Sequence, residues 1–159
     1  MNRTYLLLGS NIGNSNASLA KAIIQIEKKI GPATRQSGLY RTAAWGNIKQ
    51  PDFLNQVVIV ETQLTSLQTM QTILDIEKKM GRVRTVKNAP RIIDIDILFF
   101  NKEIIGLPDL TVPHPQIQNR RFVLVPLNQL SPNMKHPGLK KTVHQLLMHC
   151  TDRLNVKKF

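Results

Sequence analysis

The sequence has a single cysteine, few aromatic residues and no long apolar run, and these shortages exclude several classes of protein. Cys150 cannot form a disulfide within the chain, so we expect a protein of the reducing cytoplasm and not a disulfide-built secreted domain. The longest apolar runs, such as Tyr5–Leu8 and Val57–Val60, are far shorter than the ~20 residues that cross a bilayer. Residues 1–15 hold only one short apolar stretch, so we expect neither a signal peptide nor a membrane partner.

Acidic residues are also scarce, and this shortage is the first indication of function. The chain has 22 Lys plus Arg against 10 Asp plus Glu, a net charge of +12. Such a field attracts polyanions, which include nucleic acid, acidic lipid and nucleoside triphosphates, although a merely solvated basic surface would have the same composition. The length of 159 residues, 42% of them hydrophobic, fits one globular domain over residues 1–159.

Hydrophobic periodicity predicts an alternation of strands and helices. Short apolar or β-branched runs predict strands over residues 5–8, 34–42, 53–62 and 92–100. Helical spacing of apolar residues, bounded by N-cap candidates and glycines, predicts helices over about 15–30 and 66–80. The order β-α-β-β-α-β is that of the ferredoxin-like fold. We therefore expect an α+β domain with a mainly antiparallel sheet and helices packed on its faces, an α/β/α sandwich.

The last third of the chain gives weaker signals. Residues 101–121 contain three prolines and are expected to be mostly loop. Phe122–Leu127 is expected to form an added strand, and the apolar residues between 139 and 150 predict a final helix.

Two aspartates in the predicted strand 92–100 carry the most informative chemistry. Side chains alternate along a strand, so Asp94 and Asp96 share one face, about 7 Å apart, with Ile92, Leu98 and Phe100. Two ionised carboxylates among apolar residues are costly to desolvate unless a cation or strong donors compensate. Mg²⁺ would compensate both charges and would take phosphate oxygens as further ligands. The alternative is a pair of aspartates bonded to arginine or to backbone N–H groups.

A basic run precedes the two aspartates. Between Lys78 and Arg91 the chain has six basic residues and no acidic one. Arg82 and Arg84 have strand-like spacing, and guanidinium groups bind phosphate oxygens in a bidentate manner without losing their charge. Beside a carboxylate-held metal, this run predicts a triphosphate clamp, whereas on its own it would be a solvated loop.

Three further positions suit a nucleotide or a heterocycle, each with a plainer alternative. Glu77 borders the apolar stripe of its helix and needs a partner, for which Arg82, Arg84 or a ribose would serve. Phe53 and Asn55 share a strand face that suits a flat heterocycle with polar edges, but a core Phe and a strand-edge Asn have the same spacing. His114 lies in a loop, where it could contact phosphate or be simply solvated.

Taken in order, these elements resemble the 6-hydroxymethyl-7,8-dihydropterin pyrophosphokinases, a family of folate biosynthesis. The resemblance covers nearly the whole chain, and its most specific part is Pro90-Arg91-Ile92-Ile93-Asp94-Ile95-Asp96. The other segments that carry it are Gly9-Ser10-Asn11, Tyr40-Arg41-Thr42, Gln50-Pro51-Asp52-Phe53-Leu54-Asn55, Glu77, Gly81-Arg82-Val83-Arg84, Val112-Pro113-His114 and Asn119-Arg120-Arg121-Phe122.

The resemblance implies that a pyrophosphoryl group passes from ATP to the pterin hydroxymethyl oxygen, with release of AMP. It implies two Mg²⁺ ions held by Asp94 and Asp96, and these aspartates with Arg82 and Arg91 as the catalytic residues. It implies ATP contacts by Glu77, Arg82, Arg84, Arg91, Ile97, His114 and Arg120. It implies pterin contacts by Thr42, Ala43, Trp45, Phe53, Asn55 and Phe122. The expected partners are these two small-molecule substrates, without nucleic acid, and the expected state is a monomer.

Two other functions stay open on the sequence. A nucleotidyltransferase also pairs a Gly-Ser turn with a strand Asp-x-Asp, but in that class the two motifs lie close together, and the product is free pyrophosphate rather than AMP. An RNA-binding module would suit +12 on a ferredoxin-like sheet. The chain, however, has only 1 Trp, 2 Tyr and 5 Phe and lacks the aromatic strand motif on which such modules stack bases.

Overall fold

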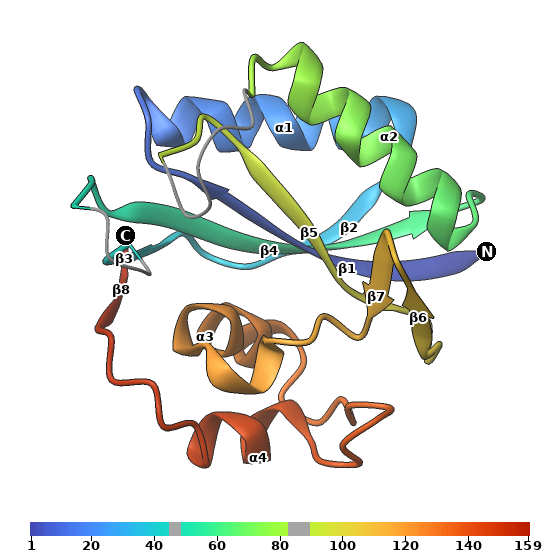
Figure 1. The fold of residues 1–159 in the computed structure, drawn as a ribbon, viewed down its shortest axis with the longest axis vertical. Helices are drawn as coiled ribbons and strands as arrows, with labels where there is room; N and C mark the ends of the chain where they lie inside the picture. Colours follow the sequence, from blue (N-terminus) through green and yellow to red (C-terminus); the bar gives the residue numbers. More distant parts are fainter. Residues whose placement is uncertain (45–48, 83–89) are drawn as a thin grey trace.

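The computed structural model of the chain describes residues 1–44, 49–82 and 90–159. Figure 1 shows one central sheet with helices on both faces, which confirms the predicted α/β/α sandwich. The helices and strands, in chain order, are β1 (Asn2–Ser10), α1 (Ser15–Lys29), β2 (Ala33–Gln36), β3 (Tyr40–Thr42), β4 (Phe53–Thr62), α2 (Ser66–Lys79), β5 (Asp94–Phe100), β6 (Ile105–Leu107), β7 (Leu110–Val112), the 3-10 helix η1 (Ile117–Asn119), α3 (Arg121–Leu130), α4 (Val143–Met148) and β8 (Val156–Lys158).

The main sheet is antiparallel throughout and has β1 and β4 at its centre. Its strand order is β5-β1-β4-β3-β8, and β2 pairs with a further part of β4. The first and last strands of the βαββαβ unit, β1 and β5, are therefore neighbours, as the ferredoxin-like fold requires. Because β1 lies between two strands and under helices on both faces, its residues Leu6 to Leu8 are all buried.

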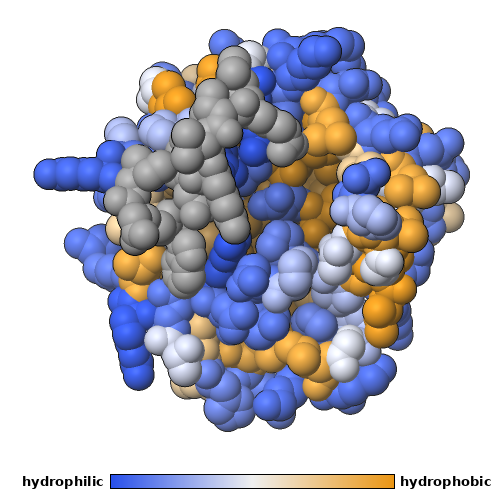
Figure 2. All heavy atoms as spheres, viewed as in Figure 1, coloured by the Kyte–Doolittle hydropathy of each residue, from blue (hydrophilic) through white to orange (hydrophobic). Residues whose placement is uncertain are grey.

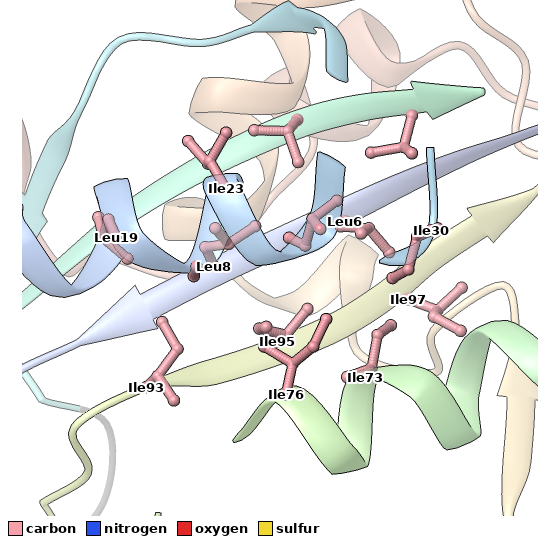
Figure 3. Packing of buried hydrophobic residues seen from close by; sticks show 14 of the residues in the cluster. Leu6, Leu8, Leu19, Ile23, Ile30, Ile73, Ile76, Ile93, Ile95 and Ile97 are labelled. Carbon is pink, nitrogen blue, oxygen red and sulfur yellow. The ribbon is translucent and has the colours of Figure 1, made fainter. Parts of the chain in front are cut away.

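α1 and α2 cover one face of the sheet. Each begins at a side-chain cap: Asn14 accepts from Ala17 N, and Thr65 accepts from Gln68 N within a capping box. Aliphatic side chains fill the space between these helices and the strands. Figure 3 labels Leu6, Leu8, Leu19, Ile23, Ile30, Ile73, Ile76, Ile93, Ile95 and Ile97 of this core.

α3 and α4 cover the opposite face, and α3 corrects one prediction. Phe122–Leu127, expected as an added strand, lies within α3. Its β-branched and aromatic residues suit a strand, but the buried residues Val123, Leu124, Leu127 and Leu130 recur at helical spacing and pack against the sheet. The need to cover this face therefore outweighs local strand propensity.

Other segments differ from the predicted outline in smaller ways. The strand expected over 34–42 is two short strands, β2 and β3, and the loop expected over 101–121 contains the β6–β7 hairpin and η1. The final helix, α4, begins only at Val143. β8, which pairs with β3 at the edge of the sheet, has no counterpart among the predicted elements.

β5 alternates regularly only over its first part. Its pairing with β1 skips Leu98, which is an extra residue in the ladder. Phe100 therefore lies in the core under α1 and α2 and not, as alternation predicts, on the face of Asp94. Ile92, just before the strand, packs against that same core, so its expected place beside Asp94 is also wrong.

The face of the molecule drawn in Figure 2 is mostly polar. Figure 2 shows hydrophilic residues over most of the visible described face, in keeping with the net charge of +12. Within the described ranges, no helix combines the length and the apolar character that a bilayer span needs.

Candidate active site

A pocket opens on the α3 face of the sheet, where β1 ends and where β4 and β5 begin. Gly9 of β1 pairs with Asn55 of β4 on one side and with Asp94 of β5 on the other. The space between the walls, counted out to the solvent at the mouth, is about 570 Å³. Its lining residues are Leu7, Gly9, Thr42, Ala43, Phe53, Asn55, Arg91, Asp94, Asp96, Arg120 and Phe122.

Asp94 and Asp96 both line this pocket, as the alternation of β5 predicts. Two guanidinium groups hold Asp94: Arg82 Nη1 donates to Oδ1 at 2.6 Å, and Arg91 Nη1 donates to Oδ2 at 3.0 Å. Asp96 keeps an edge open to the pocket, while protein surrounds the rest of it. Burial, and then the charges of Asp94 and Glu77, raise the pKa of Asp96 to about 8. Asp94 thus matches the alternative of an aspartate bonded to arginine. Asp96 is a carboxylate whose ionised form a nearby cation would stabilise.

The end of α2 sets the position of Arg82. Gly81 follows the C-cap Met80 with a φ of +93°, a conformation that other residues rarely adopt. Gly81 N donates to Lys78 O, and Arg82 N donates to Glu77 O at 3.0 Å, which are the two hydrogen bonds of a Schellman motif. The same turn brings Arg82 Nη1 to within 2.6 Å of Glu77 Oε2. Arg82 therefore belongs structurally to the helix end.

Glu77 connects α2 to β5. Its side chain is buried, and its Oε2 accepts from Ile95 N at 2.8 Å as well as from Arg82. Burial raises the pKa of Glu77, and the hydrogen bond from Ile95 and the charge of Arg82 oppose that rise. Burial alone would lower the pKa of Arg82, but Asp94 and Glu77 outweigh it and raise that pKa, so Arg82 stays charged. Of the partners that the sequence allows Glu77, Arg82 is confirmed.

The segment after β7 places His114 and Arg120 within the electrostatic reach of the aspartates. His114 N donates to Leu98 O at 3.0 Å, which fixes this segment to β5. His114 Nδ1 accepts from Gln116 N at 3.1 Å, so the neutral ring carries its proton on Nε2. Burial, and then Arg120, lower the pKa of His114, which makes the ring a neutral donor at pH 7. Arg120 lies over Phe122, with Cζ 5.8 Å from the ring centroid.

The remaining wall of the pocket is aromatic and carries an amide. Phe53, Asn55 and Phe122 come from β4 and α3 and all line the pocket. Asn55 is 3% exposed, and its Nδ2 has no hydrogen-bond partner among the described residues. β4 lies inside the sheet between β1 and β3, so the alternative of a strand-edge Asn is wrong. A buried donor without a partner is costly, so a ligand with an acceptor on its edge would be favoured here.

Asn11 connects three segments around the pocket. Its side chain is buried, and its Oδ1 accepts from Arg91 N at 2.9 Å. Its Nδ2 donates to Gln50 Oε1 at 2.8 Å and to Pro51 O at 3.0 Å. The chain before β4 and the chain before β5 are therefore both held to the end of β1.

The structure brings most of the predicted site residues together. Trp45 and Arg84 lie outside the described residues. Ile97 lies on the opposite face of β5, in the core under α1 and α2 (Figure 3), and its side chain is not in the pocket. Leu7 and Gly9 line the pocket but are absent from the predicted set. Leu7 and Gly9 are two residues apart at the end of the strand that leads into the Gly-Ser turn, and strand alternation could have predicted that they share the pocket face.

The carboxylates supply part of a metal site. Among residues 1–44, 49–82 and 90–159, no group of three or more His, Cys, Asp or Glu side chains could hold an ion alone. Asp94 and Asp96 offer hard oxygen donors to one pocket, and the raised pKa of Asp96 indicates that added positive charge is favoured there. Mg²⁺ commonly binds one or two carboxylates and completes its coordination with phosphate and water. The donors therefore fit Mg²⁺ that arrives with a phosphorylated substrate.

Comparisons with known proteins agree on one family. The family model described as 7,8-dihydro-6-hydroxymethylpterin-pyrophosphokinase (HPPK) matches residues 5–132. A Synechocystis sp. protein named 2-amino-4-hydroxy-6-hydroxymethyldihydropteridine pyrophosphokinase is 40% identical over 147 residues, 91% of this chain and 75% of that protein. A protein of the same name from Methylorubrum extorquens is 39% identical over 148 residues, 92% of each chain.

Solved structures show the same fold. The chain of the crystal structure of Plasmodium falciparum HPPK-DHPS wild type with STZ-DHP aligns with a TM-score of 0.78 at 21% identity. The alignment covers 92% of this chain and 43% of that one, so this chain spans less than half the length of that solved chain.

Proposed function

Because the chain belongs to the 7,8-dihydro-6-hydroxymethylpterin-pyrophosphokinase family, we propose that it transfers the pyrophosphoryl group of ATP to the hydroxymethyl oxygen of 6-hydroxymethyl-7,8-dihydropterin. In this reaction the hydroxymethyl oxygen forms a bond to the β-phosphorus of ATP, and the bond from that phosphorus to the α,β-bridging oxygen breaks. AMP leaves with the bridging oxygen, and the hydroxyl proton is released.

One observation carries the proposal: a single pocket is lined both by the carboxylate pair and by an aromatic wall with a buried amide. Transfer between a nucleotide and a flat heterocycle needs both kinds of surface, with the reacting atoms about 3–3.5 Å apart. A pocket with only one of them would bind one substrate.

On the nucleotide side, we assign Asp94 and Asp96 as the ligands of two Mg²⁺ ions. Held there, the ions would supply positive charge that offsets the charge of the phosphates and of the departing AMP. Arg82 and Arg91 donate to Asp94 in the structure, and the same guanidinium groups would donate to phosphate oxygens when ATP is bound. Arg82 would remain attached to Glu77 during this exchange of partners.

We propose that further residues on the nucleotide side of the pocket contact the phosphates. Arg120 lines the pocket, and His114 would donate from Nε2 as a neutral ring. By family resemblance, Arg84 and Glu77 also serve ATP binding. Ile97 could do so only through its backbone, because its side chain is in the core.

On the pterin side, we assign Phe53 and Phe122 as the two walls of a slot for the ring. Ring stacking on an aromatic side chain is worth about 1–3 kcal/mol in comparable nucleobase sites. Asn55 Nδ2 would gain the acceptor that it lacks within the described residues, and the Thr42 and Ala43 backbone would bind the remaining polar edge. By resemblance, Trp45 adds to this side.

The product identifies the reaction. The protein is incubated with ATP, Mg²⁺ and the reduced pterin alcohol, and the mixture is separated by chromatography. The proposal requires AMP and a pterin diphosphate in equal amounts and neither product when the pterin is omitted. Free pyrophosphate with a nucleotidylated pterin would instead identify a nucleotidyltransferase. Asp94→Asn should abolish formation of both products, because Asp94 is assigned as a metal ligand. Asp75→Asn, on the exposed side of α2, is its matched control and should leave product formation unchanged.

The expected partners are small molecules. An RNA-recognition sheet leaves one face open for bases, whereas α3 and α4 cover the face that carries Phe53 and Asn55. We expect a monomer that acts in the cytoplasm, and light scattering of the purified protein would measure the oligomeric state.

A further inference from the structure

The C-terminal segment, residues 150–159, contacts both sides of the pocket although none of its side chains lines the pocket. It follows α4 and ends with β8 at the edge of the sheet (Figure 1). The family match ends at residue 132, so this segment lies beyond it.

Asp152 supplies the N-terminal cap that α3 lacks locally. The N-cap residue of α3, Arg120, makes no side-chain cap, and the first turn contains no acidic residue. Asp152 Oδ2 accepts from Arg121 N, the first N–H of the helix, at 2.9 Å. Asp152 Oδ1 accepts from Leu154 N at 3.0 Å, so both oxygens are held. A carboxylate in this place satisfies an orphan donor and interacts favourably with the helix dipole.

The capped turn is the one that enters the pocket. Arg120 and Phe122, on either side of Arg121, both line the pocket. The charge of Asp152 also acts on Arg120, as one of the influences that raise its pKa. If the first turn frays, Arg120 and Phe122 leave their positions together, and the apparent affinity falls by the fraction of chains in the competent state.

The rest of the segment holds the other side. β8 pairs with β3, with Val156 opposite Thr42, and Thr42 Oγ1 donates to Asn155 O at 3.3 Å. Phe159 N donates to Leu39 O at 2.7 Å. Thr42 lines the pocket from β3, so one short segment fixes both the α3 turn and the β3 edge.

We propose that Asp152 is a positioning residue for the pterin: its hydrogen bond to Arg121 N keeps the first turn of α3 formed and thereby holds Phe122 against the ring. This proposal rests on the function proposed above. It concerns affinity for the pterin more than the chemical step, because Asp152 touches neither substrate.

The test compares four variants in steady-state assays of AMP formation, with the pterin KM, the ATP KM and kcat measured for each. D152A removes a cap worth about 1 kcal/mol, which raises the fraying constant of the turn about fivefold, so the pterin KM should rise by up to about fivefold with kcat changed less than twofold. D152N keeps an oxygen that can accept the bond, so it should restore the pterin KM to within about twofold of the wild type.

R121P removes the donor while Asp152 stays intact. Proline is tolerated at the first helical position, and the φ of −128° and ψ of 109° at Arg120 suit the residue before a proline. Because R121P leaves Asp152 without this donor, it should raise the pterin KM as D152A does. R121A, which loses the side chain but keeps the N–H, is its matched control and should behave as the wild type.

Thermal unfolding and the wild-type assay separate the possible results. A purely structural role would lower the melting temperature of D152A and leave the pterin KM of the folded enzyme unchanged, and this result would overturn the proposal. An unchanged pterin KM in R121P, or failure of D152N to rescue, would overturn it too. If D152A does not fold, the R121P and R121A pair decides. Absence of AMP with the wild-type protein would instead refute the proposed function itself.

Discussion

Gly9→Ala tests the pocket geometry most directly, because it adds one methyl group where the two substrate walls meet. Gly9 lies between Asn55 and Asp94 in the sheet and lines the pocket. A Cβ at this position would be 3.0 Å from Asn55 Oδ1 and 3.7 Å from Phe53 Cδ1. The first distance is too short for ordinary contact, so Asn55 must move by a few tenths of an ångström.

This displacement should weaken pterin binding without destabilising the fold. In the free protein Asn55 relaxes away from the new methyl group, whereas a bound pterin would force it back, at an overpacking cost of about 1–3 kcal/mol. This cost corresponds to an affinity about 5- to 150-fold lower. The backbone at Gly9 does not have a positive φ, so alanine fits it, and the loss of unfolded-state entropy should offset part of the strain, by about 0.4–1 kcal/mol. Affinity and stability should therefore not fall together.

The measurements are a fluorescence titration with the pterin and a thermal melt. Gly106→Ala is the matched control, because a Cβ there would meet nothing within 4 Å. We expect the pterin Kd of Gly9→Ala to rise while its melting temperature and ATP KM stay close to those of the control. An unchanged pterin Kd would refute the placement of the ring beside Asn55, and a parallel loss of melting temperature would show that the substitution acts on the fold.

Four other substitutions should each alter a different measured property. Asp96→Ala should abolish Mg²⁺-dependent turnover while the circular dichroism spectrum stays native, because the fold does not need this buried carboxylate; retained activity would contradict the metal assignment. Arg82→Ala should lower kcat more than ATP affinity, since we propose that Arg82 exchanges Asp94 for a phosphate oxygen after ATP has bound; an effect on ATP affinity alone would argue otherwise. Phe122→Ala should weaken pterin binding by about 1–3 kcal/mol in a titration, and no change would remove it from the ring slot. Burial lowers the pKa of His136, and its Nδ1 accepts from Gly138 N and Leu139 N. As the pH falls, the unfolded chain therefore protonates this histidine before the folded chain does. In urea titrations the unfolding free energy should keep its highest value above pH ~6.5 and decrease below it, and His136→Phe should remove this contribution to the pH dependence.

The sequence predicts the site best where a local rule acts alone. Strand alternation places Asp94 and Asp96 on one face, and the structure has both in one pocket. The C-terminal glycine of α2 ends the helix where expected and so brings Arg82 to the site. In both cases, neighbours in the chain determine the outcome.

Prediction fails where distant segments decide. The extra residue at Leu98 exists only in the ladder with β1, so Phe100 was assigned to the wrong face. The segment from Phe122 has strand propensity but becomes helical because the sheet face above it must be covered. Asp152 caps a helix that begins 31 residues earlier in the chain, and no local pattern announces such a contact.

The Schellman turn after α2 also has a consequence for variation among related chains. The guanidinium of Arg82, which we propose as a phosphate ligand, is anchored two residues beyond the C-cap Met80 through the Glu77 carbonyl and carboxylate. Insertions, deletions or changes of composition further along the connection to β5 therefore leave this first arginine in register. Related chains can therefore differ in sequence beyond Arg82 while the position of this guanidinium stays tied to the end of α2.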